Sequence, residues 1–178
     1  MTERQRKIEV VPYDPHWPDL FAEEAAAIRG IGADCFLAVH HIGSTSVPGL
    51  VAKPVIDLML EVSDLTELEG YDGEMEGLGY VVKGEYGIPG RRFYLKGVWH
   101  RTHHVHAFLQ GSSGLTRHLA FRDYLRAHPE DAAEYGALKF SNAAKFPHDM
   151  DGYCEAKHDY VTSLEQRAVR WASVADGS

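Results

Sequence analysis

The sequence predicts one α+β domain, in which a mixed sheet of about five strands comes first and a helical C-terminal third follows. Short apolar or alternating segments, separated by glycine- and proline-containing turns, fill residues 36–109, whereas helical periodicity dominates from residue 115 onward. Strands followed by a block of helices are typical of an α+β fold and not of alternating βαβ units. The length of 178 residues fits a single ordinary domain.

The first two thirds of the chain are expected to supply the sheet. Apolar residues at helical spacing predict a first helix over 17–29, which ends at Gly30. A second, loosely patterned helix is predicted over 64–78. Apolar or alternating runs bounded by turn residues predict the strands. These runs cover residues 8–11, 36–42, 55–62, 79–82, 91–96 and 103–109.

The last third is expected to be helical throughout. The Gly-Ser-Ser-Gly segment at 111–114 precedes a predicted helix over 115–127. Pro129 suits the first turn of a further helix that runs to about residue 145. A final helix is predicted over 151–172. Because the segment joining the two parts is short, we expect the helices to belong to the same domain as the sheet.

Composition and charge exclude several classes of protein. The formal net charge of −8 gives the chain no broad positive field, which argues against non-specific binding of nucleic acid. No apolar run is long enough to span a bilayer, and the charged N-terminal residues do not form a secretory signal. The two cysteines are far apart, which suits a reducing compartment. We therefore expect a cytoplasmic protein without a membrane partner; the oligomeric state and any protein partner stay open.

The most informative segment joins the predicted strands 36–42 and 55–62. A strand ends abruptly at Gly43, Ser44, Thr45 and Ser46, and the next strand carries Asp57. A glycine lets the backbone approach a ligand closely, and hydroxyl and amide groups at a turn can bind phosphate oxygens. Lys53 would add positive charge, and Asp57 could hold a divalent cation beside that phosphate.

Alternation along the strands sharpens this hypothesis. On the strand from Val55, Asp57 points away from the face that looks like core, and on the strand from His103 so do His104 and His106. On the strand at 91–96 the polar face is expected to hold Arg92, Tyr94 and Lys96. If the three polar faces coincide, an acid, two imidazoles and two cations line one cleft, which suits a metal-bound phosphate. Taken alone, however, such a turn is more often only a turn, and such histidines are more often surface residues.

Four blocks of sequence resemble the GrpB family in the same order, over residues from about 10 to 171. The blocks are VPYDPHWPDLFAEE, HHIGSTSVPGLVAKPVIDLML, RTHHVHAF and LAFRDYLRAHPEDAAEYGALK. That family is also similar to a domain appended to some bacterial dephospho-CoA kinases. The resemblance implies a nucleotidyltransferase-type fold, with a mixed sheet flanked by helices. It also implies that Gly43 and Ser44 bind phosphate and that Asp57 is the first metal carboxylate.

The sequence departs from the nucleotidyltransferase pattern at one position. The second carboxylate of that pattern is replaced by Met59, and Glu61 lies about 13 Å further along the strand from Asp57, too far to serve the same metal. Nucleotidyl transfer usually uses two metals held by bridging acids. Here His104 or His106 could complete a single site for Mg²⁺, Mn²⁺ or a softer divalent ion. The HHVH segment, which resembles a feature of the family, favours such a site.

Two functions of different classes remain open on this basis. The first is a metal-dependent nucleotidyltransferase acting on a nucleoside triphosphate, with Asp57 and Ser44 catalytic and Asp57, His104 and His106 at the metal. The triphosphate would contact residues 43–46 and Lys53, while Arg92 and Lys96 would stabilise the leaving pyrophosphate. The second is a non-catalytic nucleotide-binding module that acts through a partner. A phosphohydrolase that uses the histidines is a third, weaker possibility.

Overall fold

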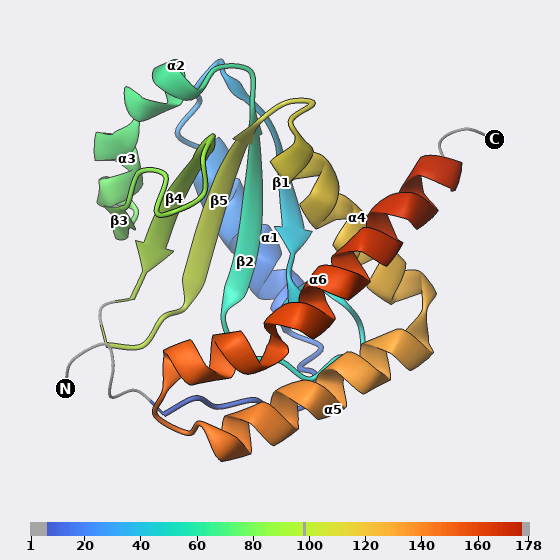
Figure 1. Ribbon diagram of the computed structural model, residues 1–178. Coiled ribbons are helices and arrows are strands. Elements are labelled where there is room, and N and C mark those ends of the chain that lie inside the picture. Colours follow the sequence, from blue (N-terminus) through green and yellow to red (C-terminus); the bar gives the residue numbers. More distant parts are fainter. Residues whose placement is uncertain (1–6, 98, 176–178) are drawn as a thin grey trace.

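The computed structural model describes residues 7–97 and 99–175 and contains one five-stranded mixed sheet with helices on both faces (Figure 1). The sheet has the order β1-β2-β5-β4-β3, in which only the central pair β2–β5 is parallel. The α+β class and the helical C-terminal region are confirmed. The strands are β1 (Phe36–Ile42), β2 (Ile56–Val62), β3 (Tyr80–Val82), β4 (Arg91–Lys96) and β5 (His103–Leu109).

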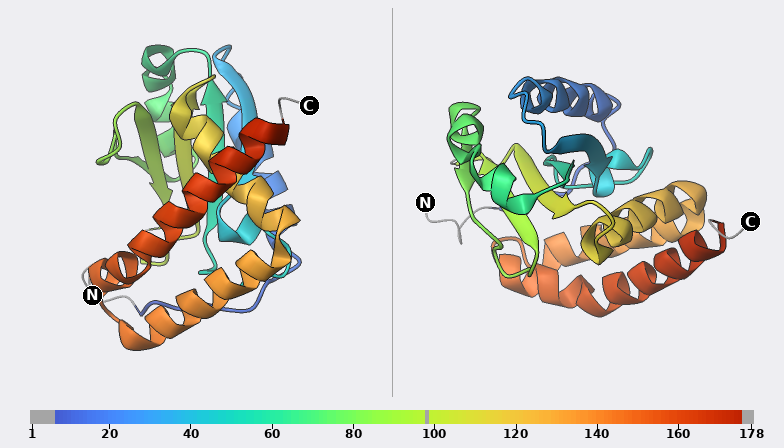
Figure 2. Two further views of the ribbon diagram at one scale, coloured as in Figure 1. Left: turned by 45° about the vertical axis from the view of Figure 1, so that its right-hand side comes forward. Right: turned by 90° about the horizontal axis from the view of Figure 1, so that it is seen from above.

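In the described part of the chain, six α-helices cover both faces of the sheet. Figure 2 (right) shows α1, α2 and α3 over one face and α4, α5 and α6 over the other. The helices are α1 (Trp17–Arg29), α2 (Leu65–Glu69), α3 (Asp72–Gly77), α4 (Ser113–Ala127), α5 (Pro129–Lys145) and α6 (Met150–Ala175). None of the helices in the described ranges is long and apolar enough to cross a membrane.

The main core lies between the sheet and α1–α3. Leu58, Leu60 and Ala107 from the sheet are fully buried there against Ile28 of α1 and Met75 of α3. Burial of apolar surface stabilises a fold by roughly 25 cal/mol for each Å², and this layer holds more of the buried apolar residues than either of the other two clusters. Because one face of β2 and of β5 is buried in this layer, the other face of each strand points toward α4–α6.

A separate apolar cluster holds the C-terminal helices together and attaches them to the loop after β1. Leu125 and Leu164 are buried between the helices, and Val47 and Leu50 of the loop pack against them. Gly136 of α5 makes this contact close, because a β-carbon there would lie 3.1 Å from Val51 Cγ2. The helical third is therefore packed directly on the segment that joins β1 to β2.

Two predicted elements differ from the structure. The helix expected over 64–78 is two short helices, because the chain turns at Gly70 after α2 and α3 begins again at Asp72. The strand expected over 8–11 contributes one isolated bridge, between Val11 and Ala52. The Ile8 N–H donates to the carbonyl of Pro147, in the turn between α5 and α6, so this segment packs on the C-terminal third instead of extending the sheet.

Candidate functional site

Asp57, His104 and His106 meet on the two central strands of the sheet, β2 and β5. The parallel register of β2 and β5 pairs Asp57 with His104 and Met59 with His106, so the three polar side chains emerge on the same face. Oδ1 of Asp57 lies 3.2 Å from Nδ1 of His104 and 3.3 Å from Nε2 of His106. One ligand atom from each residue falls within 4.8 Å of the others, which is compatible with a shared metal ion.

The carboxyl group of Asp57 is held in its charged form. Burial alone would raise the pKa of Asp57, but the contacts with His104 and His106 outweigh burial and hold that pKa well below its ordinary value. Asp57 is therefore an anion throughout the physiological pH range. A carboxylate and two imidazoles form a donor set that fits Mn²⁺ or a softer divalent ion better than Mg²⁺, which prefers oxygen ligands.

Gly43 lies against Asp57 at the end of β1. The antiparallel register pairs Ile42 with Asp57, which brings the next residue of the turn beside the carboxylate. The backbone of Gly43 has φ +71°, and a β-carbon there would lie only 2.7 Å from Oδ2 of Asp57. Glycine is required here for two reasons, a backbone angle that side chains disfavour and the close approach to the carboxylate.

The three hydroxyls of the turn do not behave alike. The turn forms a short 3-10 helix over Ser44–Ser46. Ser44 borders the cavity next to Asp57, but the hydroxyl of buried Thr45 lies 2.9 Å from Nε2 of His41, and that of Ser46 donates to the Gly43 carbonyl at 2.5 Å. The side chains of Thr45 and Ser46 therefore stabilise the turn; Thr45 also borders the cavity, whereas Ser46 does not.

His41 makes the turn sensitive to acid. Burial, followed by the charge of Arg126, lowers the pKa of His41 from 6.5 to about 4. The unfolded chain therefore binds a proton between these pH values that the folded chain does not. The free energy of unfolding should fall by up to about 3 kcal/mol as the pH drops from 6.5 to 4. Urea denaturation at both pH values should show a smaller fall for His41→Gln; an equal fall would contradict this assignment.

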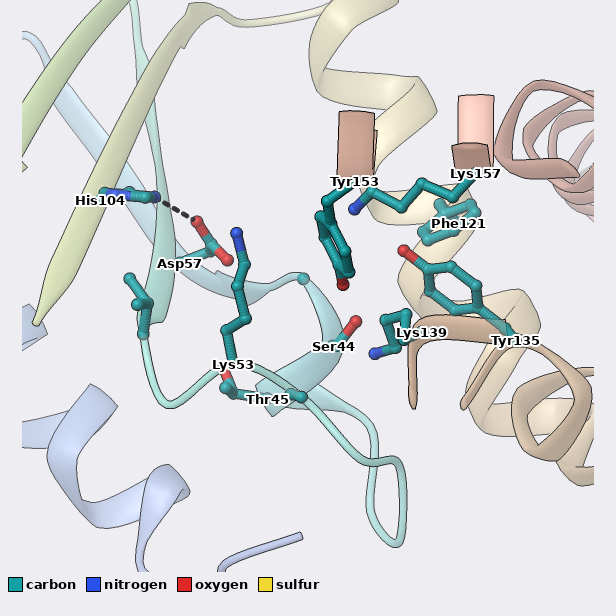
Figure 3. Close-up of a pocket in the computed structure, with 13 residues that line it drawn as sticks. Ser44, Thr45, Lys53, Asp57, His104, Phe121, Tyr135, Lys139, Tyr153 and Lys157 are labelled. Atoms are coloured by element: carbon teal, nitrogen blue, oxygen red, sulfur yellow. Dashed lines mark hydrogen bonds and ion pairs between the residues drawn. The ribbon is translucent and has the colours of Figure 1, made fainter. Parts of the chain in front are cut away.

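A cavity of about 240 Å³ lies between this end of the sheet and the C-terminal helices (Figure 3). The sheet side contributes Asp57 and His104, and the loop contributes Lys53. The opposite wall comes from helices α4, α5 and α6, which sequence reasoning did not connect with the site. Its residues are Phe121, Tyr135, Lys139, Tyr153 and Lys157.

Arg92 and Lys96 do not lie at this cavity. The register of β4 with β5 pairs Phe93 with His106, so Arg92, Tyr94 and Lys96 point to the opposite face of the sheet. There Nε of Arg92 donates to Glu69 at 2.6 Å, and Nζ of Lys96 donates to buried Glu24 at 2.8 Å. The prediction that Arg92 and Lys96 line the same cleft as Asp57 is therefore wrong. The register places both cations on the opposite face, where acids on α1 and α2 neutralise them.

Arg91, and not Arg92, is the β4 arginine on the face of the sheet that carries His106. It is buried, and its Nη1 lies 3.5 Å from Nδ1 of His106. Its other donors bind backbone carbonyls of Glu85 and Tyr86 in the loop before β4. Arg91 thus connects that loop to one of the two histidines at the metal-compatible site.

The family model described as GrpB protein matches residues 7–167 of the chain. The chain belongs to the GrpB family. A solved structure, the conserved protein GrpB from Enterococcus faecalis, superposes with a TM-score of 0.89 at 41% sequence identity, covering 92% of this chain and 99% of that one. The GrpB resemblance derived from the four sequence blocks is thereby confirmed.

Relatives of this GrpB chain include longer proteins. UPF0157 protein YqkA of Bacillus subtilis is 43% identical over 94% of the chain, yet the chain spans only 49% of YqkA. A dephospho-CoA kinase of Mycolicibacterium paratuberculosis is 28% identical over 93% of the chain, which spans 47% of that protein. The GrpB domain therefore occurs both as the greater part of short proteins and as about half of longer ones.

Proposed function

We propose that this GrpB protein is a metal-dependent nucleotidyltransferase that uses a nucleoside triphosphate. The observation that carries the proposal is the convergence of the Asp57 carboxylate, the His104 imidazole and a glycine-serine turn at one cavity, with the His106 imidazole in contact with the same carboxylate. Asp57 lies within hydrogen-bonding distance of His104 and His106, and its other oxygen packs against Gly43. A phosphate that lies on the turn at Ser44 would thus be adjacent to the metal-compatible group.

Each residue has a defined part in the proposed reaction. The carboxylate of Asp57, with His104 and His106, would hold the cation, which when bound neutralises phosphate charge and lowers the pKa of a coordinated hydroxyl. Ser44 donates its hydroxyl to a phosphate oxygen, and Lys53 provides a positive charge at the same cavity. The acceptor hydroxyl attacks the α-phosphorus and releases its proton to solvent, the bond from the α-phosphorus to the oxygen that bridges to the β-phosphate breaks, and pyrophosphate leaves.

A non-catalytic nucleotide-binding module is the second candidate, and the surroundings of Met59 favour it. Met59 replaces the second carboxylate of the nucleotidyltransferase pattern and is fully buried in an apolar cluster with Ile42, Phe108 and Leu115. Its cross-strand partners are His40 and His106, so the position lies next to the site but supplies no carboxylate, and Asp57 is the one acid at the cavity among the described residues. The dephospho-CoA kinase relative also supports a domain that serves a partner.

One assay separates these functions. The protein is incubated with ATP labelled at the α- or γ-phosphate, in the presence of Mg²⁺ or Mn²⁺. We expect release of labelled pyrophosphate, faster with Mn²⁺ than with Mg²⁺. Binding without turnover would support the module, and release of inorganic phosphate alone would support a phosphohydrolase.

The turn itself is tested by replacing Ser44, which is half-buried and borders the cavity. Ser44→Val should weaken triphosphate binding, measured by calorimetry, by about tenfold, because a hydrogen bond to a charged phosphate is worth roughly 1.5–3 kcal/mol. Ser113→Val, at the start of α4 and away from the cavity, is the control and should leave affinity unchanged. Equal losses in the two variants would remove the turn from the site.

A further inference from the structure

The hydroxyl of Tyr153 is buried beside the cavity without a hydrogen-bond partner among the residues that the structure describes. Tyr153 belongs to α6 and is fully buried, and its hydroxyl points toward the cavity near Ser44 (Figure 3). Burial raises the pKa of Tyr153 to about 12, so the group keeps its proton and can donate. Burying a polar group without a partner is unfavourable, and a ligand acceptor at this position would remove that penalty.

Three ammonium groups surround the same space. Nζ of Lys157 lies 4.9 Å and Nζ of Lys53 lies 5.5 Å from the centre of the Tyr153 ring. Lys139 is only 3% exposed; its Nζ donates to the Val51 carbonyl and lies 4.6 Å from the centre of the Tyr135 ring. All three lysines border the cavity, one from the loop and two from the helices.

The lysines are not matched by an equal number of acids. Asp57 is the single carboxylate that borders the cavity among the described residues, and it is already held by His104 and His106. Burial and the neighbouring charges of Lys157 and Lys53 lower the pKa of Lys139 from 10.5 to about 7. An acidic protein thus places three lysines in one small space, and a bound anion that carries several charges would favour their protonated forms.

We propose that α5 and α6 provide a polyphosphate subsite, in which Lys139, Lys157 and Tyr153 bind the terminal phosphates of the ligand without needing a metal ion. Lys53 and Ser44 complete the subsite from the loop. This inference rests on the proposed function and extends it, because it assigns the β- and γ-phosphates to the helical third. Inorganic triphosphate carries the same chemistry and is therefore the probe.

The test is calorimetric titration of inorganic triphosphate in the presence of EDTA. We expect the unmodified protein to bind it, Lys157→Met to bind at least about tenfold more weakly, and Tyr153→Phe to lose a similar factor. Tyr160→Phe is the matched control, since its hydroxyl is also buried on α6 but does not border the cavity. Lys145→Met, an exposed lysine at the end of α5, controls for overall charge.

The outcomes separate this subsite from the catalytic proposal. Asp57→Asn should retain triphosphate binding in EDTA even though it loses turnover, and ATP should bind much more tightly than AMP. A folded protein that does not bind triphosphate at millimolar concentration overturns the subsite. Equal affinity in Tyr153→Phe, Lys157→Met and the two controls overturns it as well, whether or not the protein releases pyrophosphate from ATP.

Discussion

Replacing Asp57 with Asn should reduce pyrophosphate release from ATP by roughly 10³-fold, the scale found when a group that stabilises transition-state charge is removed. The substitution keeps the size of the side chain and an oxygen that can accept from the histidines, but it removes the negative charge that would hold a cation. Single-turnover measurement of pyrophosphate at saturating Mn²⁺ would show the effect on the chemical step and not on metal affinity alone.

Glu61→Gln is the control for this experiment. Glu61 lies on the same strand and the same face as Asp57, and its Oε2 lies 2.9 Å from Nε2 of His40, away from the cavity. The control should keep pyrophosphate release within about twofold of the unmodified protein. If both variants lost activity to the same extent, a general change in the charge of the sheet face would explain the result, and Asp57 would have no special role.

Gly43→Ala should damage the site through the position of Asp57. The new β-carbon would meet Oδ2 of Asp57 at 2.7 Å, so the carboxylate has to move away from the two histidines. A misplacement of about 1 Å in such a site can cost roughly 10²-fold in rate. We expect Mn²⁺ affinity, measured by electron paramagnetic resonance, and pyrophosphate release to fall together.

Gly49→Ala separates this clash from the backbone effect. Gly49 has φ +80°, close to the +71° of Gly43, but a β-carbon there would meet nothing within 4 Å. Both variants should therefore lose about 1–3 kcal/mol of unfolding free energy from the strained angle. Only Gly43→Ala should also lose the metal, and equal Mn²⁺ affinity in the two variants would contradict the proposed contact.

The sequence was sufficient to predict the five strands of the sheet, the turn and the group of Asp57, His104 and His106, but it wrongly predicted a further strand over 8–11. Alternation works on β2 and β5 because each has one apolar face packed against α1–α3 and a polar or mixed face opposite. On β4 both faces are largely buried, so its polar residues did not indicate which side faces the site. The acids of α1 and α2 that pair with Lys96 and Arg92 are remote in sequence, and no local pattern reveals such pairs.

The helical half of the cavity could not be predicted from periodicity. Tyr135, Lys139, Tyr153 and Lys157 follow ordinary helical spacing, and their convergence depends on how α5 and α6 pack against the loop after β1. One signal was available, since Tyr135 and Lys139 lie inside the last of the four blocks that resemble the family. A tyrosine and a lysine one helical turn apart are, however, too common to indicate a binding site alone.

The crowding of Lys53, Lys139 and Lys157 offers a way to find the natural ligand before the reaction is known. Their mutual repulsion, and the burial of Lys139, oppose folding at neutral pH. An anion that binds among them relieves both effects and also contributes its own binding energy, so the midpoint of heat denaturation should rise steeply with its concentration. Measuring the midpoint of heat denaturation with a series of phosphorylated metabolites would therefore rank them by affinity for this cavity.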